Sequence, residues 1–288
     1  MSGADVPPGT GAEPHGFPLD ELLRIARMAA DGAATLITDR RPEHLGVTQK
    51  STETDHVTEM DTAAERLIRE VLAQHRPADA VLGEEFGGEI SPDGVTWIVD
   101  PIDGTTNYLY DHPGYAVSVA AWNGAIPLVG VVADPTHRRT YHARLGGGAW
   151  CSDPQDPAGP VRRLSLGKPR PLPQMLIATG FGYEPARRAV QGRVVAELLP
   201  QVRDIRRMGA AALDMCSVAA GRVDAYYEAG LSVWDLAAGR LIASEAGATV
   251  EAIEGGEVRP GSVLVCHPER VGELRALLHR CGVSPIDV

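Results

Sequence analysis

One apolar strand that ends directly in two carboxylates constrains this chain more than any other feature. Residues 96–107 read TWIVDPIDGTTN, so Asp100 and Asp103 lie three residues apart, with Pro101 fixing the chain between them. The strand end predicts a rigidly held Asp100. Asp103 on the following turn can point to the same spot, with the Ile102 carbonyl as a third hard oxygen. Oxygen ligands alone favour Mg²⁺ over zinc or copper. A strand followed by an ordinary acidic turn is the alternative for this segment.

Small residues with free N–H groups follow the second carboxylate. Gly104, Thr105 and Thr106 offer backbone donors and hydroxyls, which can hold a phosphate if a helix or an anion-binding turn begins there. Such a cradle beside oxygen ligands strengthens the case for Mg²⁺.

Further acidic residues lie where other elements begin or end. Glu84 and Glu85 follow a short apolar strand, so a carboxylate again stands at a strand end. Asp235 opens an amphipathic helix, where capping and the helix dipole alone favour an acidic residue. Asp61 has the same ordinary explanation, as the acidic member of a capping box that begins at Thr58. We expect Glu85 to be an exposed neighbour rather than a ligand.

Charge and composition exclude several classes of protein. The chain has 38 Asp and Glu against 27 Lys and Arg, a net charge of −11, which argues against nucleic acid as a non-specific partner. Its four cysteines show no zinc-ligand spacing, and its N-terminus lacks the apolar core of a signal peptide. The uncharged stretch 115–133 is interrupted by Asn123, Gly124 and Pro127, which predicts two strands joined by a turn rather than a membrane span. We therefore expect a soluble, cytoplasmic protein.

The pattern of elements predicts two halves behind a disordered tail at residues 1–17. Residues 18–151 form an α+β half, with helices over 22–37 and from Thr58, and strands near 80–82, 96–99, 115–122, 126–133 and 140–143. The segment 152–160, rich in Asp, Pro and Gly, is the expected boundary. Residues 161–288 form an α/β half, with strands near 175–178, 224–228 and 249–253 and helices near 187–199, 210–220, 234–246 and 269–280.

These segments together resemble the inositol monophosphatase family from about Pro18 onward. WIVDPIDGTTN at 97–107 matches the first family signature, and WDLAAGRLIASEAG at 234–247 matches the second. Supporting matches are Lys50-Ser51 with residues 58–61, the triplet 83–85, and residues 224–228. Two long signatures in the right order and at the right spacing make a chance match very improbable. Within the family, the chain looks most like bacterial, actinobacterial-type inositol-1-monophosphatases.

The resemblance implies a layered α/β/α/β/α sandwich, usually dimeric, that holds two to three Mg²⁺ ions. Asp100 would bridge two ions. Glu84 and the Ile102 carbonyl would complete the first site, Asp103 and Asp235 would complete the second, and a third, weaker ion would also use Glu84. Thr105 and Asp61 would orient the attacking water beside Glu84.

The resemblance also assigns residues to the substrate. Amides of Gly104 and Thr105 would hold phosphate oxygens, and Glu228 would accept hydrogen bonds from substrate hydroxyls. Gly209, Ala210, Ala211 and Asp235 would line the same pocket.

The chemistry agrees with these roles. Phosphate monoester hydrolysis needs up to ~10²¹-fold acceleration, which paired metals supply by polarising the phosphoryl oxygens, activating water and stabilising the leaving oxygen. The cations would also let an acidic protein bind an acidic substrate. We expect an inositol-phosphate phosphatase, a phosphoric monoester hydrolase that acts on inositol 1-phosphate or a similar polyol or sugar monophosphate and is inhibited by lithium.

Some alternatives stay open. Relatives of the fold hydrolyse fructose 1,6-bisphosphate or histidinol phosphate with the same metal set, because specificity lies in the leaving-group pocket. Glu228 disfavours a second substrate phosphate nearby. Family members commonly have Ser or Thr at the position of Ala210, so a hydroxyl that could contact the substrate is missing and broader substrate acceptance is expected. A non-catalytic regulatory binding protein is the alternative from another class of function.

Overall fold

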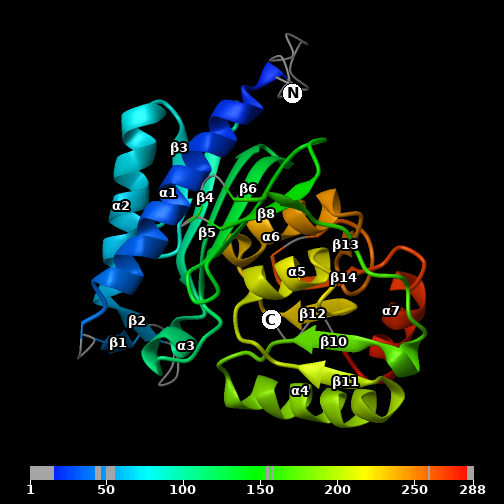
Figure 1. Cartoon of the computed structure of the whole chain (residues 1–288). Coiled ribbons are helices and arrows are strands. Elements are labelled where there is room, and N and C mark those ends of the chain that lie inside the picture. Colours follow the sequence, from blue (N-terminus) through cyan, green and yellow to red (C-terminus); the bar gives the residue numbers. More distant parts are fainter. Residues whose placement is uncertain are drawn as a thin grey trace.

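Two large β-sheets, one two-stranded sheet and seven α-helices form the main elements of the described part of this computed structural model (Figure 1). The structure describes residues 16–42, 47–49, 56–153, 156, 159–258 and 260–283. The helices are α1 Leu19–Asp39, α2 Glu59–His75, α3 Thr105–Leu109, α4 Pro185–Leu198, α5 Ala211–Ala219, α6 Val233–Glu245 and α7 Val271–Arg280. None of these described helices is long and apolar enough to cross a bilayer.

A seven-stranded sheet carries the first half of the chain. Its spatial order is β3 Ala80–Gly83, β4 Val95–Asp103, β5 Ala116–Asn123, β6 Ile126–Asp134, β7 Arg139–Arg144, β8 Ala149–Ser152 and β9 Arg162–Arg163. Strands β3 and β4 are parallel, and all the other neighbours are antiparallel. The hairpin of β5 and β6 confirms the two strands and turn predicted for residues 115–133.

A smaller mixed sheet carries the second half. Its order is β11 Asp204–Arg206, β10 Leu176–Thr179, β12 Ala225–Ala229, β14 Ser262–Cys266 and β13 Thr249–Glu251. The pairs of β10 are parallel, whereas β14 runs antiparallel to both of its neighbours. A separate short pair joins β1 Val47–Gln49 to β2 His56–Thr58.

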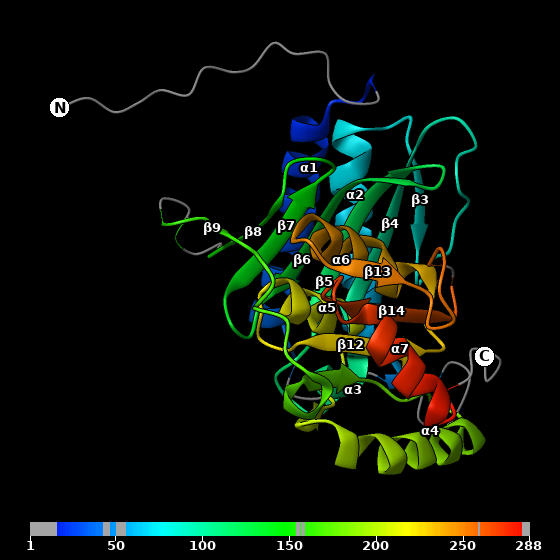
Figure 2. The ribbon, with the colours of Figure 1, turned by 90° about the vertical axis from the view of Figure 1, so that its right-hand side faces the viewer.

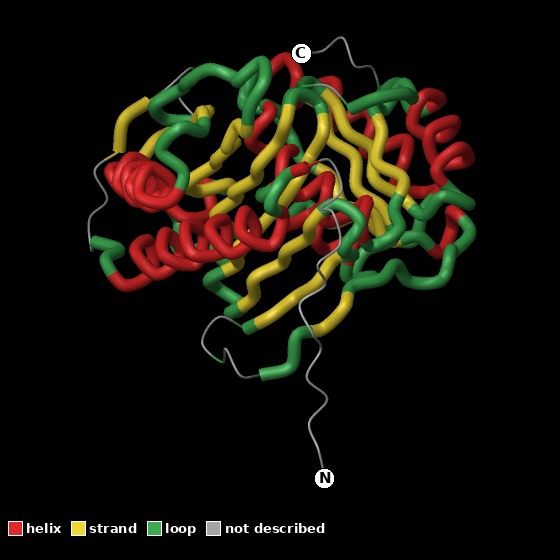
Figure 3. Tube along the Cα trace, turned by 90° about the horizontal axis from the view of Figure 1, so that it is seen from above, coloured by secondary structure: helices red, strands yellow, loops and turns green. Residues whose placement is uncertain are grey.

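The helices and sheets alternate in five layers, which confirms the α/β/α/β/α sandwich. Helices α1 and α2 cover one face of the larger sheet, α5 and α6 lie between the two sheets, and α4 and α7 cover the outer face of the smaller sheet (Figures 1 and 2). Figure 3, seen from above, shows the two groups of strands with helices between and outside them.

The outer and inner helices are built differently. The predicted stripe of α1, which includes Leu22, Ile25 and Ala29, is fully buried against the sheet. Every residue of α5 is buried, as expected for a helix with a sheet on both sides. Helix α6 approaches the larger sheet so closely that a Cβ atom on Gly130 would lie 2.8 Å from the carbonyl oxygen of Ala238.

Several details depart from the sequence predictions. Strands β8, β11 and β14 were not predicted, and β9 still pairs with β8 beyond the expected boundary at 152–160. Helix α3 begins at Thr105, within the segment where either a helix or an anion-binding turn was considered. Phe17, placed in the predicted tail, packs against the core beside α1. Residues 1–15 of that tail, and the matched pair Lys50-Ser51, lie outside the described residues.

Candidate active site

Three aspartates meet at the end of strand β4 and the start of helix α6. Carboxylate oxygens of Asp100, Asp103 and Asp235 all lie within 4.8 Å of one another. Residues three apart in a regular strand face opposite sides of the sheet. Here the register with β5 shifts between Asp100 and Asp103, and this bulge turns both carboxylates to one site. Asp103 therefore belongs to the strand, and the predicted turn begins one residue later.

The three carboxylates are held in an unfavourable environment for negative charge. Burial raises the pKa of Asp100 well above its ordinary value, and repulsion from Glu84, Asp103 and Asp235 raises it further. Burial likewise raises the pKa of Asp103 to about 7 and that of Asp235 well above its ordinary range. Buried carboxylates this close need a proton or a cation between them. The cluster can therefore hold a metal ion, and its all-oxygen donors fit a hard cation such as Mg²⁺.

Asp103 also anchors a helix. Its two carboxylate oxygens accept hydrogen bonds from the N–H groups of Ala211, at 3.2 Å, and Ala212, at 2.7 Å. These are among the free N–H groups at the start of α5, where a negative charge is favourable. Ala210, which precedes them, is in extended conformation and its side chain is 1% exposed within the core between the sheets.

A second hydrogen-bonded group lies beside the acidic cluster. The predicted capping box of α2 is present: Asp61 accepts hydrogen bonds from the backbone N–H and the hydroxyl of Thr58, and the Thr58 hydroxyl accepts one from the Asp61 N–H. The other carboxylate oxygen of Asp61 lies 3.2 Å from the hydroxyl of Thr105, which also lies 3.1 Å from the Ile102 carbonyl oxygen. Because Asp61 is fully buried, it holds this hydroxyl in a fixed place.

Backbone segments crowd together at Gly104. This residue has φ of +91°, and a Cβ atom on it would lie 2.9 Å from the carbonyl oxygen of Gly114 and 3.0 Å from that of Gly209. Helix α3 begins at the next residue, Thr105. The missing side chain therefore lets three chain segments approach one another, and Gly104 and Thr105, at the start of α3, both line the cavity.

Glu228 at the end of β12 faces the same space. Its carboxylate accepts a hydrogen bond of 2.7 Å from the Tyr226 hydroxyl. Burial raises the pKa of Glu228, whereas the Tyr226 hydrogen bond and the charge of Arg207 lower it. A Cβ atom on Gly180 would lie 1.9 Å from this carboxylate, so only glycine leaves the space that it occupies.

The acidic cluster, Gly104, Thr105 and Glu228 all line one cavity of about 410 Å³. Among the residues predicted for the site, the lining contains Glu84, Asp100, Ile102, Asp103, Gly104, Thr105, Gly209, Ala211, Glu228 and Asp235. Ala210 and Asp61 do not line it. The cavity is large enough for a sugar phosphate, because ligand pockets of small molecules are typically ~300–1,000 Å³.

Comparisons with known proteins place this site in a family. The model of the inositol monophosphatase family matches residues 18–281. The chain belongs to the inositol monophosphatase family. Inositol-1-monophosphatase SuhB of Mycobacterium tuberculosis is 44% identical over 282 residues, covering 92% of this chain and 96% of that protein. Nus factor SuhB of Pasteurella multocida is 36% identical, covering 91% and 97%.

Solved structures of the family agree with the fold. Mycobacterium tuberculosis SuhB superposes with a TM-score of 0.77 at 43% identity, covering 91% of this chain and 97% of that one. The suhB protein of Bartonella henselae gives a TM-score of 0.82 at 33% identity, covering 91% and 99%.

One buried carboxylate of this family member was missed by the sequence analysis. Glu65 on α2 is 0% exposed and accepts hydrogen bonds from the backbone N–H of Glu85, at 2.7 Å, and of Phe86, at 3.3 Å. It also pairs with Arg69 at 2.8 Å. Its carboxylate thereby fixes the loop that carries Glu84. The available signal was its position four residues after Asp61, on the same side of the helix.

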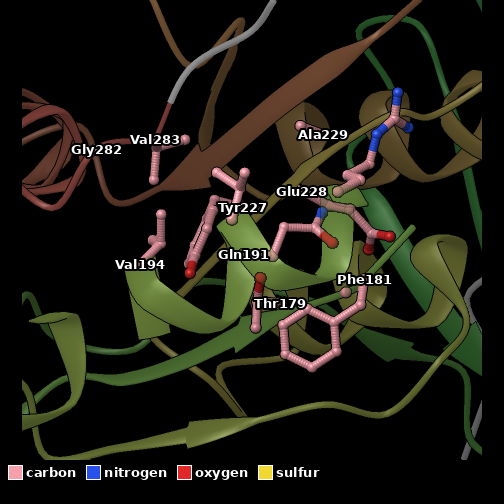
Figure 4. Close-up of a pocket in the computed structure, with 12 residues that line it drawn as sticks. Thr179, Phe181, Gln191, Val194, Tyr227, Glu228, Ala229, Gly282 and Val283 are labelled. Carbon is pink, nitrogen blue, oxygen red and sulfur yellow. The ribbon is translucent and has the colours of Figure 1, made fainter. Parts of the chain in front are cut away.

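The sequence analysis also missed two arginines and an aromatic residue. Arg187, Arg207 and Phe181 line the cavity together with Glu228. Beside it, a narrow pocket of about 30 Å³ shares Phe181 and Glu228 and extends toward Val194, Tyr227 and Val283 (Figure 4). No sequence motif marked these residues, because only the fold brings α4 and the segment after β11 to the site.

Proposed function

We propose that this protein is an Mg²⁺-dependent phosphomonoesterase that hydrolyses inositol 1-phosphate or a similar polyol or sugar monophosphate. The observation that carries the proposal is the meeting of Asp100, Asp103 and Asp235 on the wall of a sugar-phosphate-sized cavity. Relatives named inositol-1-monophosphatase, at 44% identity over most of the chain, support the same substrate class.

The acidic residues would hold two to three Mg²⁺ ions. Carboxylates of Glu84, Asp100, Asp103 and Asp235, with the Ile102 carbonyl, supply only oxygen donors, as Mg²⁺ prefers. Bound there, Mg²⁺ polarises the phosphoryl oxygens, lowers the pKa of a bound water and stabilises the leaving oxygen.

The remaining residues of the site would position the reactants. The Thr105 hydroxyl, which donates its hydrogen to Asp61, would accept a hydrogen bond from the attacking water and so orient it beside Glu84. The N–H groups of Gly104 and Thr105 would bind phosphate oxygens at the start of α3. Glu228 would accept hydrogen bonds from hydroxyls of the leaving group, beside the backbone of Gly209 and Ala211.

A phosphate-release assay tests the proposal directly. Inositol 1-phosphate, fructose 1,6-bisphosphate and histidinol phosphate should be compared with Mg²⁺ and with excess chelator. Asp100→Asn should nearly abolish turnover and the Mg²⁺-induced rise in Tm, because it weakens the cation site, while Asp93→Asn, an exposed control before β4, should preserve both. Full activity in excess chelator would contradict the proposal.

The assay also separates the alternatives. Preferred hydrolysis of fructose 1,6-bisphosphate or of histidinol phosphate would assign that activity to this protein in place of the hydrolysis of inositol 1-phosphate. Some relatives are named Nus factor SuhB, which keeps a non-catalytic binding role as the second candidate. Release of no phosphate from any of these substrates would favour it. We further propose a cytoplasmic homodimer inhibited by lithium; light scattering and an assay in millimolar LiCl test the oligomeric state and the inhibition.

A further inference from the structure

Two guanidinium groups stand near Glu228 in the part of the cavity formed by the second half of the chain. Arg187 lies on α4, and Arg207 follows β11; both line the cavity that also contains the acidic cluster. The charge of Arg207 lowers the pKa of Glu228, so the two groups are close enough to interact across the cavity.

Neighbouring glycines and an aromatic ring define where these guanidinium groups lie. A Cβ atom on Gly230 would be 2.1 Å from Nη1 of Arg187, and one on Gly182 would be 2.5 Å from its Cδ atom. A Cβ atom on Gly209 would lie 2.4 Å from Nη1 of Arg207. The Arg207 guanidinium lies 5.9 Å from the centre of the Phe181 ring. The absent side chains provide the space that the two arginines occupy.

Neither guanidinium group forms an ion pair or a hydrogen bond with the residues that the structure describes. Among the described residues, neither has a carboxylate oxygen within 4.0 Å, although Arg69, Arg76 and Arg275 each form an ion pair. No described acceptor forms a hydrogen bond with either group. An arginine with unused donors in a cavity can bind carboxylate or phosphate with two parallel hydrogen bonds.

We propose that Arg187 and Arg207 form an anion-binding subsite that selects phosphate monoesters whose leaving group carries a second anionic group, a carboxylate or a phosphate. The proposal rests on the proposed function and narrows its substrate class, because inositol 1-phosphate, whose leaving group is uncharged, becomes one of the weaker substrates. It also changes the expectation drawn from Glu228 alone, because Arg187 and Arg207 line the cavity together with that carboxylate and add two positive charges to its wall. Hydroxyls of the leaving group would contact Glu228, and its anionic group would contact the arginines.

A matched pair of substrates isolates the effect of the second anion. Glycerol 2-phosphate and 2-phosphoglycerate differ only in that one hydroxymethyl group is replaced by a carboxylate. Fructose 1-phosphate and fructose 1,6-bisphosphate form the corresponding pair for a phosphate. The ratio of kcat/KM values within each pair, measured at constant ionic strength with Mg²⁺, reports recognition of the added anion and cancels effects common to both substrates.

The variants are Arg187→Gln and Arg207→Gln, with Arg188→Gln as the control. Arg188 is the exposed next residue of α4 and does not line the cavity. Since a hydrogen bond to a charged group is lost, each test variant should lower the ratio roughly ten-fold or more. The Arg188 variant should keep the wild-type ratio.

Each outcome decides the question. A wild-type kcat/KM ratio near one would overturn the subsite, and so would a ratio that neither test variant changes. An equal loss of kcat/KM for both substrates of each pair would overturn it as well. A change confined to the carboxylate pair or to the phosphate pair would identify which anion is recognised. If no ester is hydrolysed, the proposed function fails. Calorimetric binding of 2-phosphoglycerate and glycerol 2-phosphate to the same variants then tests the subsite separately.

Discussion

Replacing Glu65 by alanine should damage the active site without touching any residue that faces the cavity. The Glu65 carboxylate is fully buried and links helix α2 to the loop after β3 through the N–H groups of Glu85 and Phe86 and the side chain of Arg69. Arg69 in turn donates a hydrogen bond to the Gly87 carbonyl. Glu84 lies on this loop, so its position depends on Glu65.

The structure gives the size of the effect. Hydrogen bonds to a charged group contribute ~1.5–3 kcal/mol each, but water can reach the partly exposed loop and Arg69, so we expect a total loss of about 2–4 kcal/mol. For a chain of this size that is roughly 5–15 °C in Tm. Glu65→Gln keeps one acceptor oxygen and should lose less. Because Glu84 would be displaced, the Mg²⁺ concentration for half-maximal stabilisation should also rise.

Thermal and urea unfolding with and without Mg²⁺ measure both effects. Glu70→Ala is the matched control, since Glu70 lies on the exposed side of the same helix. Equal Tm values and equal Mg²⁺ dependence for Glu65→Ala and Glu70→Ala would refute the positioning role. A loss of stability with unchanged Mg²⁺ dependence would reduce Glu65 to a structural residue.

Three further predictions concern single residues. Thr105→Ala should lower kcat far more than it raises KM, because the oriented water matters chiefly in the transition state; unchanged kcat would leave Asp61 only its capping role. Ala210→Ser gives the N-cap residue of α5 a hydroxyl that can accept a further N–H beside those bound by Asp103, and should stabilise the fold by about 0.5–2 kcal/mol in thermal unfolding. Assays with inositol 1-phosphate and glycerol 2-phosphate would show whether the hydroxyl also reaches a ring substrate. Burial lowers the pKa of His142 to about 4, below its unfolded value near 6.5, so the unfolded state binds a proton first and stability falls as pH drops through this window. The loss reaches about 3 kcal/mol below pH 4, and His142→Phe should remove it from the pH dependence of Tm.

The strongly patterned elements of this fold could be predicted from sequence. The stripe of α1 and the capping box of α2 are local signals, and the structure contains both. Strand β14 was missed although all its residues are buried. Its serine and four apolar residues fit either a strand or a buried helix turn, and only pairing with β12 and β13 decides between them.

Prediction of the candidate site from sequence is limited in the same way, because tertiary structure brings several of its residues together. Asp100 and Asp103 stand out because a strand runs into them, yet their convergence depends on a bulge that no local pattern indicates. Arg187 belongs to a helix that has little amphipathic pattern of its own, so its direction is set by packing between distant segments. Residues placed by local structure were therefore predictable, and residues placed by tertiary packing were not.

The distribution of charge in the cavity suggests how an acidic protein would orient an acidic substrate. Carboxylates of Asp100, Asp103 and Asp235 gather at one side, where they would attract cations and, through them, the phosphate to be cleaved. The guanidinium groups of Arg187 and Arg207 line the part of the cavity that contains Glu228 and would attract the other end of the molecule. A leaving group with hydroxyls and an anionic group would bind Glu228 through its hydroxyls and the two arginines through its anionic group. In the reversed orientation, the phosphate to be cleaved would lie away from the cation site. The same separation of charge that would permit binding would thereby also select the productive orientation.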